Sequence, residues 1–213
     1  MASIPTLKSL DLNRVILDLR AADPVLGRLI AEVGLFRPDW TLSASPYKGL
    51  FRSIVYQQLS GKAAATILGR VLALFGNGSI PPPERLLAMS DDALRGAGLS
   101  RNKTAAIRDL AARTRDGTVP DRTEARRISD EALIDRLTAV RGVGRWTAEM
   151  LLMFGLGRPD VLPTSDLGIR KGYQRVYSMR RLPAEVTIVR QGRRWAPYRT
   201  VASWYLWRAV ELD

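Results

Sequence analysis

Helix signals recur along this chain while strand signals are nearly absent, and this contrast restricts the fold more than any other sequence feature. Asp23-Pro24 is a typical helix start, and Gly34 is a typical helix stop. The apolar residues between them share one helical face: Val25, Leu26, Leu29, Ile30 and Val33. The sequence therefore predicts an all-α fold.

Further helices are expected on the same grounds. They span about residues 46–58, 61–75, 84–89, 91–96, 101–115, 145–154, 166–178 and 197–210, together with a helix that follows Ser129. Ser60, Ser90, Ser100 and Ser129 stand where a hydroxyl can cap a helix. Residues 115–127 are polar and are expected to form a surface loop, while residues 182–194 match no element clearly.

The chain is strongly basic. Its 33 Lys and Arg residues exceed its 21 Asp and Glu residues by 12, and the sequence pI is about 10.8. Most of the excess lies between Leu167 and Arg208, where ten basic residues accompany a single acid, Glu185. Aromatic residues interleave with these charges, which is typical of nucleic-acid-binding surfaces. Nucleic acid is the expected partner, although such a charge run can also be a solvated face.

Cysteine and histidine are both absent from the chain. Their absence excludes disulfides, zinc sites built on Cys or His, iron–sulfur clusters, thiol nucleophiles and acid–base chemistry by imidazole. Proton transfer must therefore use Asp, Glu, Lys or Tyr. No stretch approaches the ~20 apolar residues of a membrane span, and the N-terminus lacks the apolar region of a signal peptide. We expect a cytoplasmic protein at the nucleoid, without a membrane partner.

Residues 129–154 are expected to form two helices joined by the turn Gly142-Val143-Gly144. The two glycines permit positive φ and a close approach of the backbone to another group. The amides of Val143, Gly144 and the following residues then stand at a helix N-terminus, where they can bind an anion such as a phosphate. A turn of this composition can equally be a plain connector.

Two stretches carry a resemblance to a known family. Residues 137–149, LTAVRGVGRWTAE, and residues 162–166, LPTSD, resemble the helix-hairpin-helix, the Gly/Pro-rich loop and the aspartate motif of the DNA glycosylase superfamily. The resemblance is strongest to DNA-3-methyladenine glycosylase II and covers roughly residues 10–210. Shorter matches lie at residues 23–26, 56–60, 195–199 and 205–207.

The resemblance implies two helical lobes with the DNA- and base-binding cleft between them. One lobe comprises residues 1–45 plus 160–213 and carries the aspartate motif and the basic segment. The other is a central bundle of residues 46–159 that contains the helix-hairpin-helix at about 129–154.

The resemblance assigns the catalytic carboxylate to Asp166. Cleavage of an N-glycosidic bond builds positive charge on the deoxyribose, and an adjacent carboxylate can stabilise that charge or orient the attacking water. From the residues alone Asp166 is a helix N-cap, and the two roles are compatible. Relatives that also cut the DNA backbone carry a lysine where this chain has Trp146, so the resemblance implies a monofunctional glycosylase without AP-lyase activity.

Other site residues also follow from the resemblance. Trp146, Met150 and Trp207 take positions that line the base pocket, where an aromatic face attracts a cationic alkylated base by about 0.5–2 kcal/mol. Met150 stands where some relatives have a tyrosine, which leaves the range of substrates open. Gln58 and Leu59 take the position of the wedge that enters the duplex where the damaged nucleotide is extruded.

The resemblance also implies that the hairpin holds the DNA backbone. The contacts are assigned to Gly142, Val143, Gly144, Arg145 and Thr147. Relatives bind a monovalent cation, Na⁺ or K⁺, through hairpin carbonyls that correspond to those of Thr138, Val140 and Val143. No other cofactor is expected. The expected partner is double-stranded DNA with a damaged base, bound by a monomer.

Two other functions remain open on the sequence. One is a non-catalytic helix-hairpin-helix module that holds DNA phosphates through the hairpin and the basic segment. A carboxylate such as Asp166 speaks against it, because a negative charge beside DNA lowers affinity unless chemistry needs it. The other is a glycosylase for deaminated or mismatched bases, since the shape of the pocket decides the substrate.

Overall fold

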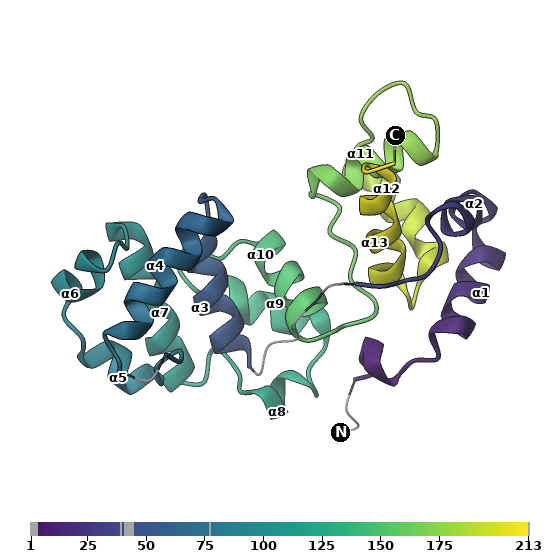
Figure 1. Ribbon diagram of the computed structural model, residues 1–213. Coiled ribbons are helices and arrows are strands. Elements are labelled where there is room, and N and C mark those ends of the chain that lie inside the picture. Colours follow the sequence, from purple (N-terminus) through teal and green to yellow (C-terminus); the bar gives the residue numbers. More distant parts are fainter. Residues whose placement is uncertain (1–3, 39, 41–44, 77, 213) are drawn as a thin grey trace. The chain divides into compact units, whose positions relative to one another are not determined.

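The structure is a computed structural model in which every regular element of the described residues is a helix (Figure 1). The predicted all-α fold is confirmed. None of the described helices is long and apolar enough to cross a membrane. The described residues are 4–38, 40, 45–76 and 78–212.

The described residues divide into two compact units. The central unit takes those of Met1–Ile4 and Ser43–Leu151, and the terminal unit takes those of Pro5–Leu42 and Leu152–Asp213. Residues 152–159, placed in the central bundle on sequence grounds, therefore belong with the terminal unit.

Hydrogen bonds account for this placement of residues 152–159. The buried Arg158 receives a bond on its carbonyl oxygen from Thr200 Oγ1 at 2.7 Å. The amide of Thr200 donates to the carbonyl of Pro159 at 3.0 Å. The start of the last helix thus holds this stretch in the terminal unit.

The central unit encloses an apolar core between short helices. Leu50, Phe51 and Ile54 on one helix, Leu110 on a second and Leu137 on a third are all fully buried. The helices are α3 (Pro46–Tyr56), α4 (Gly61–Ala73), α5 (Pro83–Ala88), α6 (Asp91–Gly96), α7 (Arg101–Arg115), α8 (Arg122–Ala125), α9 (Asp130–Thr138) and α10 (Arg145–Met150).

The four predicted serine caps are confirmed. Each hydroxyl accepts a hydrogen bond from the backbone amide three residues further on, which satisfies one of the free donors at the helix start. The capping residues are Ser60 of α4, Ser90 of α6, Ser100 of α7 and Ser129 of α9.

The terminal unit is built around a close pair of helices, α11 and α13, which lie side by side (Figure 1). A Cβ atom added at Gly172 of α11 would lie 1.9 Å from the carbonyl oxygen of Leu206 of α13, so only glycine allows this approach. The helices of the unit are η1 (Leu7–Ser9), α1 (Leu12–Ala22), α2 (Pro24–Val33), α11 (Leu167–Val176), α12 (Glu185–Gly192), η3 (Arg193–Trp195) and α13 (Arg199–Ala209).

Several elements differ from the sequence predictions. Helix α1 was not predicted, although Asp11 caps it and Val15 and Leu19 are buried at helical spacing. The helix expected over 145–154 ends at Met150, and the chain continues as a π-helical turn, η2 (Leu151–Gly155). The expected loop over 115–127 contains the short helix α8, and the unassigned stretch 182–194 contains α12.

A buried carboxylate, Asp23, ties the terminal unit together. Its Oδ1 accepts from the amides of Val25 and Leu26 at 3.0 and 3.1 Å and thereby caps α2. Its Oδ2 accepts from Trp195 Nε1 at 2.9 Å, Gln191 Nε2 at 2.7 Å and the hydroxyl of Tyr177. Burial acts to raise the pKa of Asp23, but these donors outweigh it and the pKa is lowered. Asp23 is a structural anchor between α2 and the segment around α12.

Candidate functional site

Asp166 stands at the N-terminus of α11 and is half-buried. Its Oδ1 accepts from the amide of Ile169 at 2.9 Å, which confirms the predicted N-cap. The same oxygen accepts from the indole Nε1 of Trp207 on α13, also at 2.9 Å. The structure therefore brings together two residues that the sequence assigned to one site, and it joins them by a direct hydrogen bond.

A glycine makes room for this bond. A Cβ atom at Gly168 would lie 2.8 Å from Trp207 Cδ1 and 3.0 Å from both Trp207 Nε1 and Asp166 Oδ1. Real Cβ atoms do not approach other atoms so closely, so any larger residue at position 168 must displace the indole or the carboxylate.

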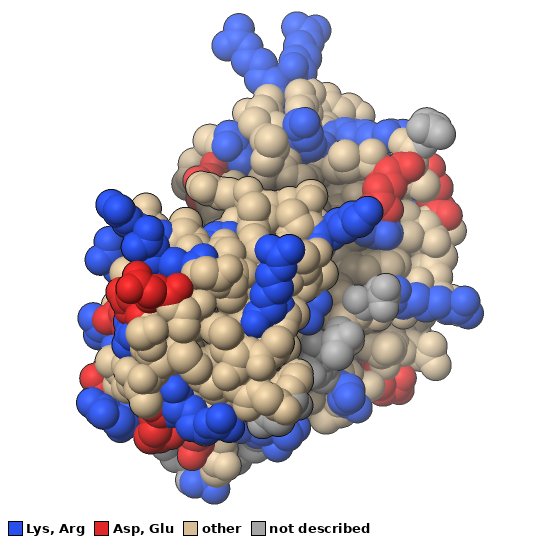
Figure 2. Space-filling model, turned by 60° about the vertical axis from the view of Figure 1, so that its left-hand side comes forward, with Lys and Arg blue, Asp and Glu red and all other residues tan. Residues whose placement is uncertain are grey.

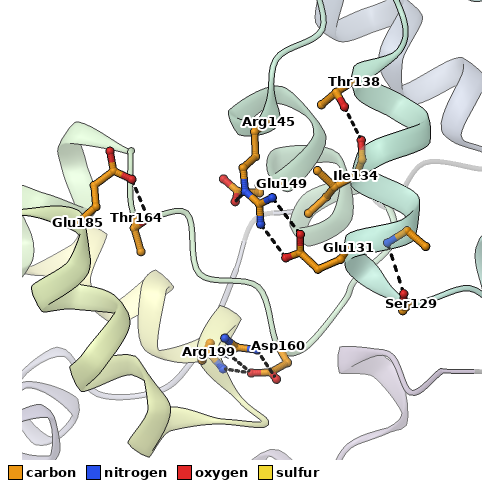
Figure 3. Close-up of polar contacts among 11 residues, drawn as sticks. Ser129, Glu131, Ile134, Thr138, Arg145, Glu149, Asp160, Thr164, Glu185 and Arg199 are labelled. Atoms are coloured by element: carbon orange, nitrogen blue, oxygen red, sulfur yellow. Dashed lines mark hydrogen bonds and ion pairs between the residues drawn. The ribbon is translucent and has the colours of Figure 1, made fainter.

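The loop that leads to Asp166 is anchored at its start by a bidentate ion pair (Figure 3). Arg199 Nε and Nη2 donate to the two carboxylate oxygens of Asp160 at 2.6 and 2.8 Å. The amide of Val161 donates to Thr200 Oγ1 at 3.0 Å. The first turn of α13 thus holds the same loop that presents Asp166. The charge of Arg199, which belongs to the basic segment, is paired with Asp160 within the protein.

The far end of the loop is anchored to α12. Thr164 Oγ1 donates to Glu185 Oε2 at 3.0 Å, and Glu185 is the single acid of the basic segment (Figure 3). Leu162 packs against Gly192, where a Cβ atom would come within 2.3 Å of its Cδ2. The sequence analysis named residues 162–166 and Glu185 but did not predict these contacts, because nothing in the local pattern shows which distant side chains they meet.

Aromatic rings adjoin Trp207 within the terminal unit. Its ring lies 5.6 Å from that of Phe154, which lies 4.8 Å from that of the half-buried Trp40. Trp195 and Trp204 are buried in the core of this unit, and the half-buried Trp40 packs against that core. Phe154 was not singled out on the sequence.

In the central unit, α9 and α10 form the predicted helix–turn–helix. Gly142 has a φ of 75°, which favours glycine, and Val143 is buried with its amide bonded to the carbonyl of Val140 at 3.0 Å. Gly144 has a φ of −90° and a ψ of 169°, values open to any residue. The expectation that both glycines serve positive φ is therefore wrong for Gly144.

Arg145 is engaged by two carboxylates (Figure 3). Its Nη1 and Nη2 donate to Glu131 at 2.9 and 2.6 Å, and its Nε donates to the buried Glu149 at 3.0 Å. The bonds with Glu131 raise the pKa of Arg145 above its ordinary value. Thr147 is buried. Contacts from these two residues to DNA stay predictions.

A model of the HhH-GPD superfamily, described as base excision DNA repair proteins, matches residues 51–197. The chain belongs to this superfamily. It is 38% identical over 202 residues to DNA-3-methyladenine glycosylase 1 of Schizosaccharomyces pombe, covering 94% of this chain and 89% of that protein.

A solved structure and a second relative agree. The solved S. pombe 3-methyladenine DNA glycosylase in complex with abasic DNA has a TM-score of 0.81 and 38% identity, over 94% of this chain and 98% of that one. DNA-3-methyladenine glycosylase 2 of Escherichia coli is 28% identical over 200 residues, 89% of this chain and 67% of that protein. The predicted family resemblance is confirmed.

The residues predicted to form the wedge, Gln58 and Leu59, lie on an exposed turn between α3 and α4. Gln58 has a φ of 56°, unusual for a residue other than glycine, and its side chain is exposed. Leu59 is 39% exposed. Trp146 on α10 is 47% exposed, and Met150 is half-buried at the end of the same helix. These four residues lie in the central unit, whereas Asp166 and Trp207 lie in the terminal unit.

The expected cation ligands of this HhH-GPD protein are backbone carbonyls at the end of α9. The carbonyl of Val140 accepts one bond, from Val143, and a carbonyl oxygen has a second lone pair for another ligand. Thr138 Oγ1 bonds back to the carbonyl of Ile134 at 2.9 Å (Figure 3). No group of three or more acidic residues among the described ones is arranged to hold a metal ion. A carbonyl site at Thr138, Val140 and Val143 stays a prediction.

Proposed function

We propose that this protein is a monofunctional DNA glycosylase that extrudes alkylated bases of the 3-methyladenine type from duplex DNA and hydrolyses their N-glycosidic bond. The observation that carries the proposal is the Asp166 carboxylate, held at the N-terminus of α11 by the Ile169 amide and the Trp207 indole. The named activities of the superfamily relatives support the same reaction.

For cleavage of the N-glycosidic bond, the main requirement on the protein is a negative charge held close to the sugar. As the bond between C1′ and the base nitrogen breaks, its electron pair leaves with the base and positive charge develops on the sugar. Asp166 stabilises that charge or orients the water whose oxygen then bonds to C1′. A base that already carries a positive charge leaves as a neutral molecule, which favours alkylated purines over normal ones.

The substrate base is expected to stack on an aromatic face. The resemblance assigns this role to Trp146 and Trp207, and the attraction of a cationic base to an indole adds about 0.5–2 kcal/mol. Trp146 also bears on the reaction class. An indole has no amine to form a Schiff base with the sugar, so the product is an abasic site in an uncut strand.

Double-stranded DNA with a damaged base is the partner, and the charge of the surface suits it. Lys and Arg side chains are spread widely over the face in Figure 2, while Asp and Glu form small groups. The net charge of +12 favours a polyanion and predicts salt-sensitive binding. We further propose that the protein acts as a monomer at the cytoplasmic nucleoid, with at most Na⁺ or K⁺ at the hairpin.

The decisive experiment measures free bases released from duplex DNA treated with dimethyl sulfate, identified by mass, for the wild type and for Asp166→Asn. The wild type should release methylated purines and leave uncut abasic strands. Asp166→Asn should lose at least about a hundredfold in rate while its DNA affinity is retained.

Other outcomes of this experiment contradict the proposal in different ways. Retained activity in Asp166→Asn contradicts the catalytic assignment, and strand cutting contradicts the monofunctional one. Tight binding without any release indicates a DNA-binding module. If methylated DNA yields no free base but duplexes with uracil or hypoxanthine, assayed alongside, do, the protein is a glycosylase for deaminated bases.

A further inference from the structure

The turn that carries the wedge residues, Gln57 to Ser60, is held by hydrogen bonds from two other parts of the central unit. Lys103 Nζ on α7 donates to the carbonyl oxygens of Val55 and Gln57, both at 2.7 Å. Gln57 Nε2 donates to the carbonyl of Gly142 in the hairpin turn at 3.0 Å. This wedge turn is therefore bonded both to α7 and to the hairpin.

One face of α7 supports both turns. Lys103, Ala106 and Asp109 follow one another at intervals of three residues, which places them on the same side of the helix. Lys103 holds the wedge turn, a Cβ atom at Gly142 would lie 3.8 Å from Ala106 Cβ, and Asp109 Oδ2 accepts the amide of Arg141 at 2.7 Å. The wedge turn and the hairpin turn thus share a single support.

The wedge turn needs such support. Gln58 has a positive φ, which costs of order 1–3 kcal/mol and persists only when the surroundings impose it. The carbonyls of Val55 and Gln57 lie at the C-terminal end of α3, where a cation bonds free acceptors and meets the negative end of the helix dipole. Lys103 is half-buried there.

We propose that Lys103 and Gln57 are positioning residues that fix the wedge turn relative to the hairpin turn. The spacing between the residues that enter the duplex, Gln58 and Leu59, and the hairpin that holds a DNA phosphate is then set before DNA binds. The inference rests on the proposed function, in which the wedge turn enters the duplex. Lys103 and Gln57 act on extrusion of the base and not on cleavage of its bond.

This role has a consequence that a merely structural role lacks. Extrusion costs least when the target base is not paired. Variants that misplace the wedge turn should therefore be slow on a paired target base and close to normal on an unpaired one. Loss of folding or of catalytic geometry would slow both substrates alike.

The test compares single-turnover release of 7-methylguanine from two duplexes, with the lesion opposite cytosine or opposite an abasic spacer. The variants are Lys103→Met and Gln57→Leu, with Lys103→Arg to restore donors to the carbonyls. Lys48→Met, which removes an exposed lysine from α3, is the matched control and should behave as wild type.

The expected result is a loss of roughly ten- to hundredfold on the paired lesion, since small misplacements have effects of this size. The loss on the unpaired lesion should be below about threefold, and Lys103→Arg should recover most of the rate. Equal losses on both substrates, or no loss on either, overturn the proposal. Thermal unfolding of each variant shows whether it is folded. If Lys103→Met does not fold, Gln57→Leu, at a half-buried position, decides the test.

A second measurement does not depend on base release. A duplex with 2-aminopurine beside a tetrahydrofuran abasic site reports wedge insertion by its fluorescence. Lys103→Met and Gln57→Leu should bind this DNA but lose most of the fluorescence change. If the wild type releases no base, the proposed function fails while this measurement still decides the role of Lys103 and Gln57. No fluorescence change with bound wild type overturns that role.

Discussion

The indole N–H of Trp207 donates to Oδ1 of Asp166 across 2.9 Å, although the two residues lie on different helices. The amide of Ile169 donates to the same oxygen. Two donors on one oxygen fix the rotation of the carboxylate about its side-chain bonds. In the proposed function Trp207 therefore has two separable roles: its ring face binds the base, and its N–H holds the carboxylate.

Trp207→Phe tests this separation, because it keeps an aromatic face and removes the N–H. We expect base release to slow by roughly 5- to 150-fold, the equivalent of a charged hydrogen bond of about 1–3 kcal/mol. DNA affinity should stay near that of the wild type, whereas Trp207→Leu should weaken both properties. Single-turnover rates and binding titrations measure the two effects, and a fully active Trp207→Phe contradicts a role for the N–H.

Gly168→Ala should slow base release through the same hydrogen bond. The added Cβ would lie 2.8 Å from the indole, so Trp207 or Asp166 must shift. Its effect should not add to that of Trp207→Phe, because both changes remove one interaction. Gly96→Ala, where a Cβ atom meets nothing within 4 Å, is the control. If the two losses in rate add in the double variant, Gly168 does not act through the bond between Trp207 and Asp166.

The ion pair between Asp160 and Arg199 should support both stability and activity. Arg199→Lys cannot form the bidentate pair, so we expect the free energy of unfolding to fall by about 1–3 kcal/mol. Base release should slow as the loop before Asp166 loosens. Urea unfolding of Arg199→Lys, Asp160→Asn and the double variant measures the coupling. Strictly additive losses would show that the pair contributes little.

Asp23 should make stability depend on pH in the acid range. Its pKa is lowered in the folded protein because several donors outweigh burial, so its contribution is complete above the ordinary aspartate pKa. That contribution is lost as pH falls through the lowered value. Unfolding midpoints of the wild type and Asp23→Asn, compared from about pH 7 to about pH 2, should converge at the acid end. A difference that does not change with pH contradicts this account.

Two glycine substitutions should change stability in opposite directions. Gly172→Ala puts a Cβ atom 1.9 Å from a carbonyl oxygen of α13 and should destabilise the protein by about 3 kcal/mol or more. A Cβ atom added at Gly69 in α4 has no atom within 4 Å, so Gly69→Ala should stabilise the protein by about 0.5–1 kcal/mol. Thermal unfolding measures both changes, and a harmless Gly172→Ala would refute the close crossing of α11 and α13.

Local sequence patterns predicted most helices and four of the five serine caps of the described helices, because an N-cap and an apolar face involve residues within one or two turns. The fifth, Ser45 at the start of α3, was not predicted. The same patterns were present for α1, where Asp11 precedes a helical apolar face, and it could have been found. The change from α10 to a π-helical turn at Leu151 had no such signal.

The sequence by itself determined the all-helical class, the restriction of the chemistry to residues other than His and Cys, and the position of Asp166 at a helix start. Only the tertiary structure decided the partners of the site residues: Trp207 for Asp166, Arg199 for Asp160, and Lys103 and Gly142 for the wedge turn. The physical reason is that capping and helical periodicity act over a few residues. Contacts between distant residues depend on how whole helices pack, which no local pattern records.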